Sequence, residues 1–384
     1  MKLLRITTIP LSLKVLLKGQ HIFMLSNGFE VVGVSSPGEE LQEVSKEEDI
    51  RIVSLEMTRT ITPFQDLKSL WNFYKLCKNE KPSIVHSHTP KAGIVAMLGA
   101  KLAGVPIRIH TVAGMPLMEA KGIKRKILDF VEKLTYSAAT RVYPNSKGLY
   151  DFILQYSFTS REKLKVIGNG SSNGIDTSIF SVENMDLNTL TALKSNLEID
   201  EKDFVFIFVG RLVGDKGINE LVEAFSRLER SHVKLLLVGP LESDLDPLAD
   251  TTQREIETNP NIISVGFQKD VRPYFAISNA LVFPSYREGF PNVVMQAGAM
   301  ELPAIVSDIN GCNEIIIEGV NGTIIPVKDP QAIRIALLRF LDDKQYYNML
   351  KVNSRRMIAD RYEQSVVWNA LLEEYKELLA NYKR

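Results

Sequence analysis

The sequence is short of cysteine and of long apolar runs, and each shortage excludes a class of protein. Only two cysteines, Cys77 and Cys312, occur among 384 residues, which argues against a disulfide-rich scaffold and favours a reducing compartment. No run reaches the roughly 20 apolar residues that span a membrane. The segment after Lys2 and Arg5 lacks the apolar core and cleavage site of a signal peptide, so we expect a cytoplasmic protein.

Two phosphate-binding motifs and a metal-ligand cluster are missing as well. Neither G-x-G-x-x-G nor G-x4-G-K-S/T opens either half of the chain, which argues against a dinucleotide cofactor and a P-loop. His86 and His88 are two residues apart, hence on one face of a strand, a spacing that metal sites use. No cysteine or carboxylate accompanies them nearby, so we expect no metal site here.

Length and composition indicate a soluble globular protein of two domains. Hydrophobic residues make up 45% and charged residues 24% of the chain, as in ordinary globular proteins, and 384 residues suffice for two cores. The net charge is zero, but residues 1–180 hold 24 Lys and Arg against 16 Asp and Glu. This asymmetry predicts that the first half meets an anionic surface. Uneven scatter of charge over solvated faces is the alternative.

Short β-branched runs alternate with helical patterns, as in a parallel sheet wound with helices. The expected strands of the first series are Leu3–Ile9, Glu30–Ser35, Ile52–Leu55, Ile84–His88, Arg108–Thr111, Val142–Asn145 and Leu164–Ile167. Those of the second are Phe204–Val209, Lys234–Val238, Ile262–Val265, Ala280–Pro284, Ala304–Ser307 and Thr323–Pro326. We therefore predict an α/β fold of two Rossmann-like sheets, with a turn-rich end over 168–176, a linker over Ser181–Asn188 and a last helix over Val366–Leu379.

One segment places an acid directly before a helix. Because Ala280–Pro284 predicts a strand and Asn292–Met300 a helix, Glu288 lies at a strand's carboxyl end, where open α/β sheets bind ligands. The N–H groups of residues 290 to 293 and the helix dipole would bind an anion, and Glu288 would accept hydrogen bonds from hydroxyls. A mere helix-terminal charge, worth about 0.3–1 kcal/mol, is the alternative.

A second motif follows the first strand of the second series. Residues 210–217 contain three glycines, which let the backbone approach a ligand closely. Arg211 and Lys216 add two positive charges, and a charge-assisted hydrogen bond to a diphosphate contributes about 1.5–3 kcal/mol. Ordinary surface charges beside a turn are the alternative.

Together these motifs resemble those of the retaining glycosyltransferases of family 4, whose GT-B fold has two Rossmann-like domains facing each other across a central cleft. The family's acid–x7–acid signature falls on Glu288 and on position 296, which is Gln here. The resemblance implies that Glu288 binds donor-sugar hydroxyls and that Gln296, which keeps an acceptor oxygen, faces the ribose. It implies a diphosphate site formed by Arg211, Lys216, Phe290, Pro291, Asn292 and Val293.

The resemblance also implies how the domains divide the work. Residues 1–180 would bind the acceptor and residues 181–359 the nucleotide-sugar donor, with a helix over 360–384 returning to the first domain. No cofactor or metal beyond the donor substrate is implied. The triplet Asp244-Leu245-Asp246 is similar to the metal-binding motif of the other large glycosyltransferase fold, but its Pro-flanked setting favours an acidic surface loop.

A histidine in the first half completes the expected site. His110 closes the strand Arg108–Thr111 and corresponds to the family's active-site histidine, which contacts the donor sugar, so Glu288 and His110 are the expected catalytic residues. Many relatives have a second histidine where Ala113 stands. His88 and Lys91, at a strand-to-helix turn, would line the cleft.

Two basic and apolar segments of the first domain predict contact with a membrane. Pro10–Met24 mixes leucines with lysines, and residues 122–128 form a second such run. The expected contacts with anionic lipid are Lys14, Lys18, Lys124, Arg125 and Lys126. An amphipathic core helix with solvated lysines is the alternative.

The resulting hypothesis is transfer of a hexose or N-acetylhexosamine from a nucleotide diphosphate sugar to a lipid-linked saccharide, with retention, in cell-surface or capsular polysaccharide assembly. The protein would be cytoplasmic, or peripheral on the inner face of the cell membrane, without a nucleic-acid partner. Two alternatives stay open: a nucleotide-sugar 2-epimerase of the same fold and a catalytically silent partner subunit.

Overall fold

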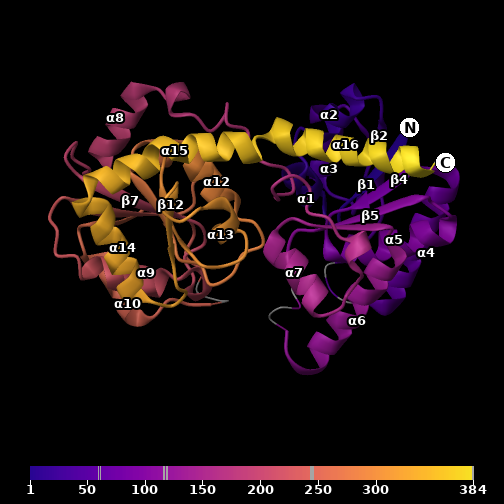
Figure 1. Ribbon diagram of the computed structural model, residues 1–384, viewed down its shortest axis with the longest axis horizontal. Coiled ribbons are helices and arrows are strands. Elements are labelled where there is room, and N and C mark those ends of the chain that lie inside the picture. The colour runs from indigo at the N-terminus through magenta and orange to yellow at the C-terminus, as the bar shows by residue number, and fades with distance from the viewer. Residues whose placement is uncertain (59, 61, 116, 118–119, 243–245, 383–384) are drawn as a thin grey trace. The chain divides into compact units, whose positions relative to one another are not determined.

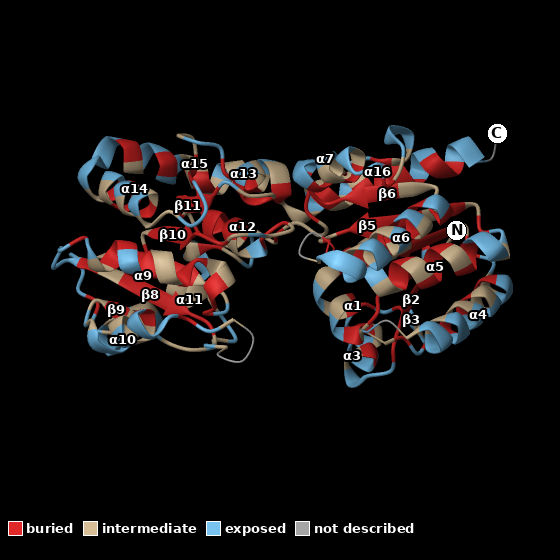
Figure 2. Cartoon of the chain, turned by 90° about the horizontal axis from the view of Figure 1, so that it is seen from below, coloured by how far each residue is buried: buried red, intermediate tan, exposed pale blue. Residues whose placement is uncertain are grey.

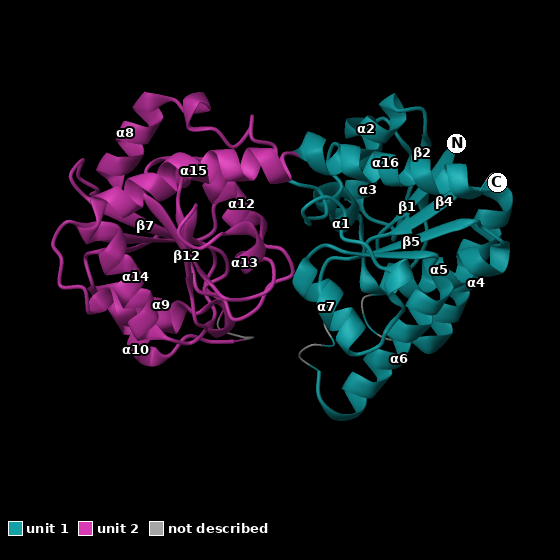
Figure 3. Ribbon diagram, in the orientation of Figure 1, with its two compact units in different colours: residues 1–174, 364–384 teal, residues 175–363 magenta. Residues whose placement is uncertain are grey.

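The computed structural model describes residues 1–384 except 59, 61, 116, 118–119, 243–245 and 383–384. The chain divides into two compact units, residues 1–174 with 364–384 and residues 175–363 (Figure 3). The first boundary thus falls at 174/175 rather than 180/181, and the returning segment begins at Gln364 rather than at 360. The chain passes between the units at these two boundaries, and there the Ile175 N–H donates to the Tyr362 carbonyl at 2.8 Å.

The first unit is a parallel six-stranded sheet in the order β3-β2-β1-β4-β5-β6 (Figure 1). Its strands are β1 (Lys2–Ile6), β2 (Glu30–Ser35), β3 (Arg51–Ser54), β4 (Ile84–Ser87), β5 (Ile107–Val112) and β6 (Arg141–Pro144). Its helices are α1 (Pro10–Leu16), α2 (Gln20–Ser26), α3 (Glu39–Glu47), α4 (Pro63–Glu80), α5 (Pro90–Ala103), α6 (Gly122–Ala138), α7 (Lys147–Gln155) and α16 (Gln364–Tyr382).

Alternate residues of these strands pack against two different helical layers, because successive side chains point to opposite faces of a sheet. Leu4 and Ile6 of β1 belong to a core shared with α4, α5, α6 and α7. Leu3 belongs to a core shared with α1, α2, α3 and α16. The last helix therefore completes the first unit.

The second unit repeats this architecture in the order β12-β11-β10-β7-β8-β9. Its strands are β7 (Phe204–Val209), β8 (Val233–Val238), β9 (Ile262–Ser264), β10 (Ala280–Phe283), β11 (Ala304–Ser307) and β12 (Gly322–Ile325). Its helices are α8 (Leu187–Asn196), α9 (Ile218–Ser226), α10 (Asp250–Thr258), α11 (Arg272–Ala276), α12 (Asn292–Ala299), α13 (Cys312–Ile315), α14 (Pro330–Asp342) and α15 (Lys344–Tyr362).

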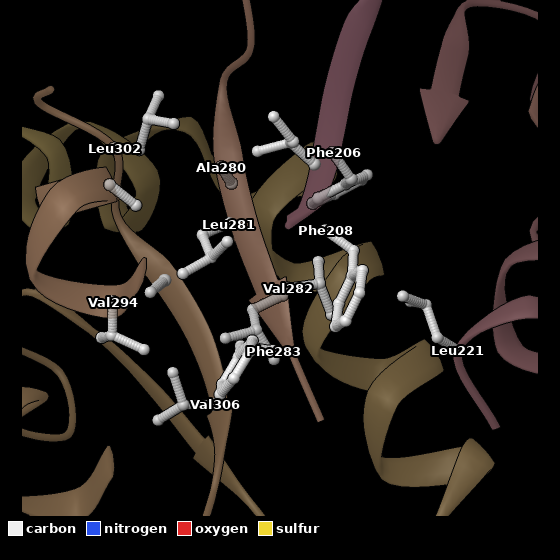
Figure 4. Packing of buried hydrophobic residues seen from close by; sticks show 14 of the residues in the cluster. Phe206, Phe208, Leu221, Ala280, Leu281, Val282, Phe283, Val294, Leu302 and Val306 are labelled. Atoms are coloured by element: carbon white, nitrogen blue, oxygen red, sulfur yellow. The ribbon is translucent and has the colours of Figure 1, made fainter. Parts of the chain in front are cut away.

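The strands of the second sheet consist largely of buried apolar residues (Figure 2). A parallel sheet between two helical layers selects such continuous apolar runs. Phe208 stacks on Phe283 of the neighbouring strand, with ring centroids 5.9 Å apart (Figure 4). Burying each such ring contributes about 1.5–3 kcal/mol.

Strand order sets the place where each unit can bind a ligand. In the second unit the first strand, β7, lies beside the fourth, β10, so the chain leaves these two strands in opposite directions across the sheet. Ligands of open α/β sheets bind outside the carboxyl ends of the strands at such a switch point. The loops there are residues 210–217 and 284–291. The same relation holds for β1 and β4 in the first unit.

Several sequence-based boundaries are corrected by the structure. The expected strand Leu164–Ile167 is reduced to one bridge between Val142 and Leu164, because left-handed residues from Gly168 onward turn the chain away from the sheet. The segment Pro10–Met24 forms α1 and most of α2. No helix in the described part of the chain is both long and apolar enough to cross a bilayer.

Candidate functional site

Lys216 is positioned by a tight turn after β7. Residues Gly214–Lys216 form one turn of 3-10 helix, η4, which ends at Gly217 with φ of 71°. A Cβ atom on Gly217 would lie 2.2 Å from the Pro284 carbonyl oxygen. Only glycine therefore allows this turn to approach the loop that follows β10.

Glu288 lies on that second loop and meets Lys216. Its Oε1 atom accepts from the Lys216 ammonium and, at 3.1 Å, from the Ser285 hydroxyl. The Lys216 and Glu288 side chains are only 15% and 19% exposed. Because water is partly excluded, this charge-assisted hydrogen bond is stronger than a surface ion pair. Two residues 72 positions apart thus form one charged site.

The beginning of α12 lies next along the same loop. Pro291 is its N-cap, and no side chain caps the helix. The Phe290 ring is buried against Tyr362, with centroids 5.4 Å apart. The N–H groups of Asn292 and Val293 have no acceptor within the helix. The anion site expected over residues 290 to 293 loses one donor, because the Pro291 nitrogen carries no hydrogen.

Arg211 and Gln296 are the two other residues of the second unit that the sequence assigned to donor binding. Arg211 is 44% exposed, and its Nη1 atom donates to Glu242 at 2.9 Å. This hydrogen bond, with smaller contributions from the carboxylates of Asp215 and Glu288, raises the pKa of Arg211. Gln296 is half-buried on α12, one turn after Asn292 and thus on the same helix face.

The sequence did not reveal what holds the Glu288 loop in place. The Asn310 side-chain amide donates to the carbonyls of Glu288 and Gly289 at 3.1 and 2.6 Å. A Cβ on Gly311 would lie 2.6 Å from the Gly289 oxygen, so glycine is required there too. Asn-Gly after a strand signals a turn, but nothing local says which loop that turn will contact.

Of the triplet Asp244-Leu245-Asp246, the first two members lie outside the described residues. Asp246 accepts through Oδ2 from the Asp215 N–H at 2.6 Å. Its described contact therefore stabilises the turn that carries Lys216.

His110 occupies a buried position on β5 of the first unit. Its Nδ1 atom lies 2.8 Å from the Ser87 hydroxyl, and its ring lies against Gly93 of α5, where a Cβ would be 2.5 Å from Cε1. Burial lowers the pKa of His110 from 6.5 to about 4. At neutral pH the ring is therefore an uncharged hydrogen-bonding group rather than a fixed cation.

His88 and Lys91 have partners within the first unit. The His88 ring is buried 4.1 Å from that of His86, and Lys91 donates to the Asp66 carboxylate at 2.6 Å. Both ring nitrogens of His86 are bonded, to the hydroxyls of Tyr375 and Thr111, so His86 connects β4 to α16. Within the described residues, no three His, Cys, Asp or Glu side chains gather as metal ligands would.

Comparison with known proteins places the chain in a family. Residues 24–170 match the "Glycosyl transferase 4-like domain" family, and residues 191–357 match "Glycosyl transferases group 1". The chain is 33% identical over 380 residues to the capsular polysaccharide biosynthesis glycosyltransferase CapM of Staphylococcus aureus, covering 98% of this chain and 97% of CapM. The chain belongs to the glycosyltransferases.

Two further relatives of this glycosyltransferase are informative. The chain is 29% identical over 311 residues to the Escherichia coli UDP-Gal:alpha-D-GlcNAc-diphosphoundecaprenol alpha-1,3-galactosyltransferase, and the match covers 80% of this chain and 78% of that enzyme. Anabaena Alr3699/HepE in complex with UDP and glucose matches with a TM-score of 0.79 at 16% identity, covering 98% and 100% of the two chains. The structural match and the two parallel sheets confirm the predicted α/β GT-B fold.

Proposed function

We propose that this glycosyltransferase moves a hexose or N-acetylhexosamine from a nucleotide diphosphate sugar to a lipid-linked saccharide, with retention, in capsular or other cell-surface polysaccharide assembly. The observation that carries the proposal is the Lys216–Glu288 pair, which lies at the switch point of the second unit beside the uncapped start of α12. It combines positive charge for a diphosphate with a carboxylate for sugar hydroxyls. The acceptor class rests on the names of the relatives.

In this proposal the second unit stabilises the leaving group. As the bond from the anomeric carbon to the donor phosphate breaks, negative charge grows on the diphosphate. Lys216 and the N–H groups of Asn292 and Val293 would hold that charge, and such preorganised donors supply a large part of catalysis. Arg211 would contribute less because its side chain is 44% exposed, against 15% for the Lys216 side chain, and water screens its charge more strongly. No metal ion is needed for these contacts.

The remaining residues would orient the reactants. Glu288 and the neutral His110 would bind the sugar hydroxyls, Gln296 the ribose, and His88 and Lys91 would line the acceptor side. The acceptor hydroxyl would attack the same face from which the diphosphate leaves, and its proton would pass to the leaving phosphate oxygen. The products are a glycoside of retained configuration and a nucleoside diphosphate.

Turnover assays distinguish this activity from its rivals. The full chain is incubated with a panel of nucleotide sugars, with and without a diphospholipid-linked saccharide, and products are analysed by NMR. We expect acceptor-dependent release of nucleoside diphosphate and a glycoside with the donor's anomeric configuration. A 2-epimerised donor sugar would instead identify an epimerase, and donor binding without turnover on any acceptor would identify a silent subunit.

Substitution of Glu288 tests the site itself. Glu288→Ala should lower turnover by at least ~10²-fold, the scale of lost transition-state hydrogen bonding, while circular dichroism shows an intact fold. The matched control is Glu223→Ala, because Glu223 lies on the surface of the same unit in an ion pair with Arg227. Wild-type turnover in folded Glu288→Ala would overturn the assignment.

A further inference from the structure

Two helices of the first unit expose stripes of large apolar side chains. On α4 these are Phe64, Leu67 and Trp71, which are 91%, 66% and 53% exposed. On α6 they are Ile123, Ile127 and Phe130, which are 79%, 44% and 66% exposed. Within each stripe the spacing of three or four residues places the side chains on one helix face.

The two stripes belong to one helical layer. Both α4 and α6 pack against α5, and their opposite sides contribute to the core that covers the sheet. Figure 2 shows the exposed sides of α4 and α6 on either side of the largely buried α5. All three helices follow carboxyl ends of strands, the edge at which this unit would bind its acceptor.

Exposed charge on this layer has a single sign. Every exposed charged residue of α4, α5 and α6, whose residues are all described, is a lysine: Lys68, Lys75, Lys78, Lys101, Lys124, Lys126 and Lys133. The acidic residues of these helices add no unpaired exposed negative charge: Asp66, Glu80 and Asp129 form ion pairs, and Glu132 is buried. The opposite layer differs, since α3 exposes Glu39, Glu43 and Glu47.

We propose that this surface, the α4–α6 face, docks the glycosyltransferase on an anionic lipid bilayer. The inference rests on the proposed function, in which the acceptor is lipid-linked. Helices that lie in a membrane interface combine Lys-rich polar sides with Trp, Phe and Leu. Protein–protein interfaces are instead depleted in lysine and enriched in arginine. The all-lysine composition therefore favours a bilayer over a protein partner.

The α4–α6 face shares only part of the lipid contacts that the sequence predicted. Lys14 pairs with Glu43 and Glu47 at 2.7 and 3.4 Å, and Leu13 and Leu17 are fully buried. Arg125 is paired with Asp129 at 2.6 Å. Lys124 and Lys126 belong to the face. The Pro10–Met24 segment exposes Leu11, Val15 and Ile22, but its helix α1 packs against the acidic helix α3.

Sedimentation of the full chain with vesicles tests the inference. We expect binding to phosphatidylglycerol-containing vesicles, little binding to pure phosphatidylcholine, and weakening by salt. Lys124→Gln with Lys126→Gln and Lys133→Gln should reduce partitioning on the order of 10²-fold. Phe64→Ser with Trp71→Ser and Phe130→Ser should reduce it as well, through lost apolar burial.

Matched control variants test whether vesicle binding depends on the α4–α6 face or on any exposed lysines and apolar side chains of the protein. Lys14→Gln with Lys18→Gln should bind like wild type. So should Leu187→Ser with Val352→Ser, which remove side chains 77% and 79% exposed on the second unit. Equal binding by all variants, or no binding of the wild type at low salt, would overturn the proposal.

Two further measurements distinguish the rival explanations. If sedimentation equilibrium shows a dimer that Phe64→Ser and Phe130→Ser dissociate, the face covers a second copy of the chain and not a bilayer. Turnover with a short-chain, water-soluble acceptor should be unchanged in the α4–α6 variants. Vesicle binding by a wild-type chain that never turns over would retain the docking surface and reject the proposed function.

Discussion

Replacing Gly93 with alanine should reverse the usual effect of that substitution. In a helix interior, Gly→Ala normally stabilises by about 1 kcal/mol. At Gly93, however, the new Cβ would lie 2.5, 2.9 and 3.1 Å from three atoms of the His110 ring, against an ordinary contact of 3.4 Å or more. The ring is buried, and the centroid of the Tyr136 ring lies 6.0 Å from its own. Overpacking of this kind costs about 1–3 kcal/mol, so we expect a net destabilisation of about 1 kcal/mol.

The same displacement should affect catalysis. To restore normal contact the His110 ring must move by roughly 1 Å, which would disturb its hydrogen bond with Ser87. A misplacement of that size costs about 10²-fold in rate. Released nucleoside diphosphate measures turnover. Urea unfolding followed by tryptophan fluorescence measures stability, and both tryptophans, Trp71 and Trp368, lie in the first unit.

A double-mutant cycle gives the decisive comparison. In the His110→Ala background the ring is gone, so Gly93→Ala should stabilise the first unit by up to about 1 kcal/mol. The sign of the effect therefore depends on His110. If Gly93→Ala stabilises equally in both backgrounds, the ring does not lie against Gly93. If stability falls but turnover does not, His110 has no part in the reaction.

Three other substitutions or conditions test separate parts of the account. Lys216→Ala should weaken nucleoside diphosphate binding more than monophosphate binding, and more than Arg211→Ala does, because Arg211 is the more exposed of the two cations; equal losses for both ligands in calorimetry would place Lys216 away from the diphosphate. Gln296→Glu should tighten donor binding, since a carboxylate accepts stronger hydrogen bonds from ribose hydroxyls; weaker binding would show that Gln296 acts as a donor. Lowering the pH from 8 to 5 should destabilise the first unit, because burial lowers the pKa of His110 to about 4. As the pH falls, His110 of the unfolded chain, with a pKa of about 6.5, binds a proton before His110 of the folded chain does. The stability that the neutral ring contributes is therefore complete above pH 6.5 and is lost as the pH falls towards 4. At pH 5 this residue lowers the free energy of unfolding by about 2 kcal/mol. Burial also lowers the pKa of His21, His86 and His88, with the same sign. Burial raises the pKa of Glu132 to about 7, which opposes the loss, so in urea titrations His110→Asn should flatten the pH dependence and Glu132→Gln should steepen it. Identical pH dependence in all three proteins would contradict these burial effects.

Local sequence determined where the strands of this protein form. Runs such as Phe204–Val209 and Ala280–Phe283 are apolar at successive positions, and only a strand covered on both faces can bury them all. The glycines of residues 210–217 and the Asn-Gly pair at 310 likewise mark their turns. The same local reasoning failed for Leu164–Ile167, because a strand also needs a partner along its length, and beyond Leu164 the chain turns away.

Tertiary structure alone decided which residues meet and which stay exposed. Lys216 and Glu288 pair because strand order sets β7 beside β10, a relation that no local pattern contains. His110 is neutral because Gly93, Ser87 and the surrounding core exclude water from its ring. Periodicity in the sequence does not say whether another element covers the apolar helix faces on which Phe64 and Phe130 lie. Only the packed fold leaves them exposed to solvent.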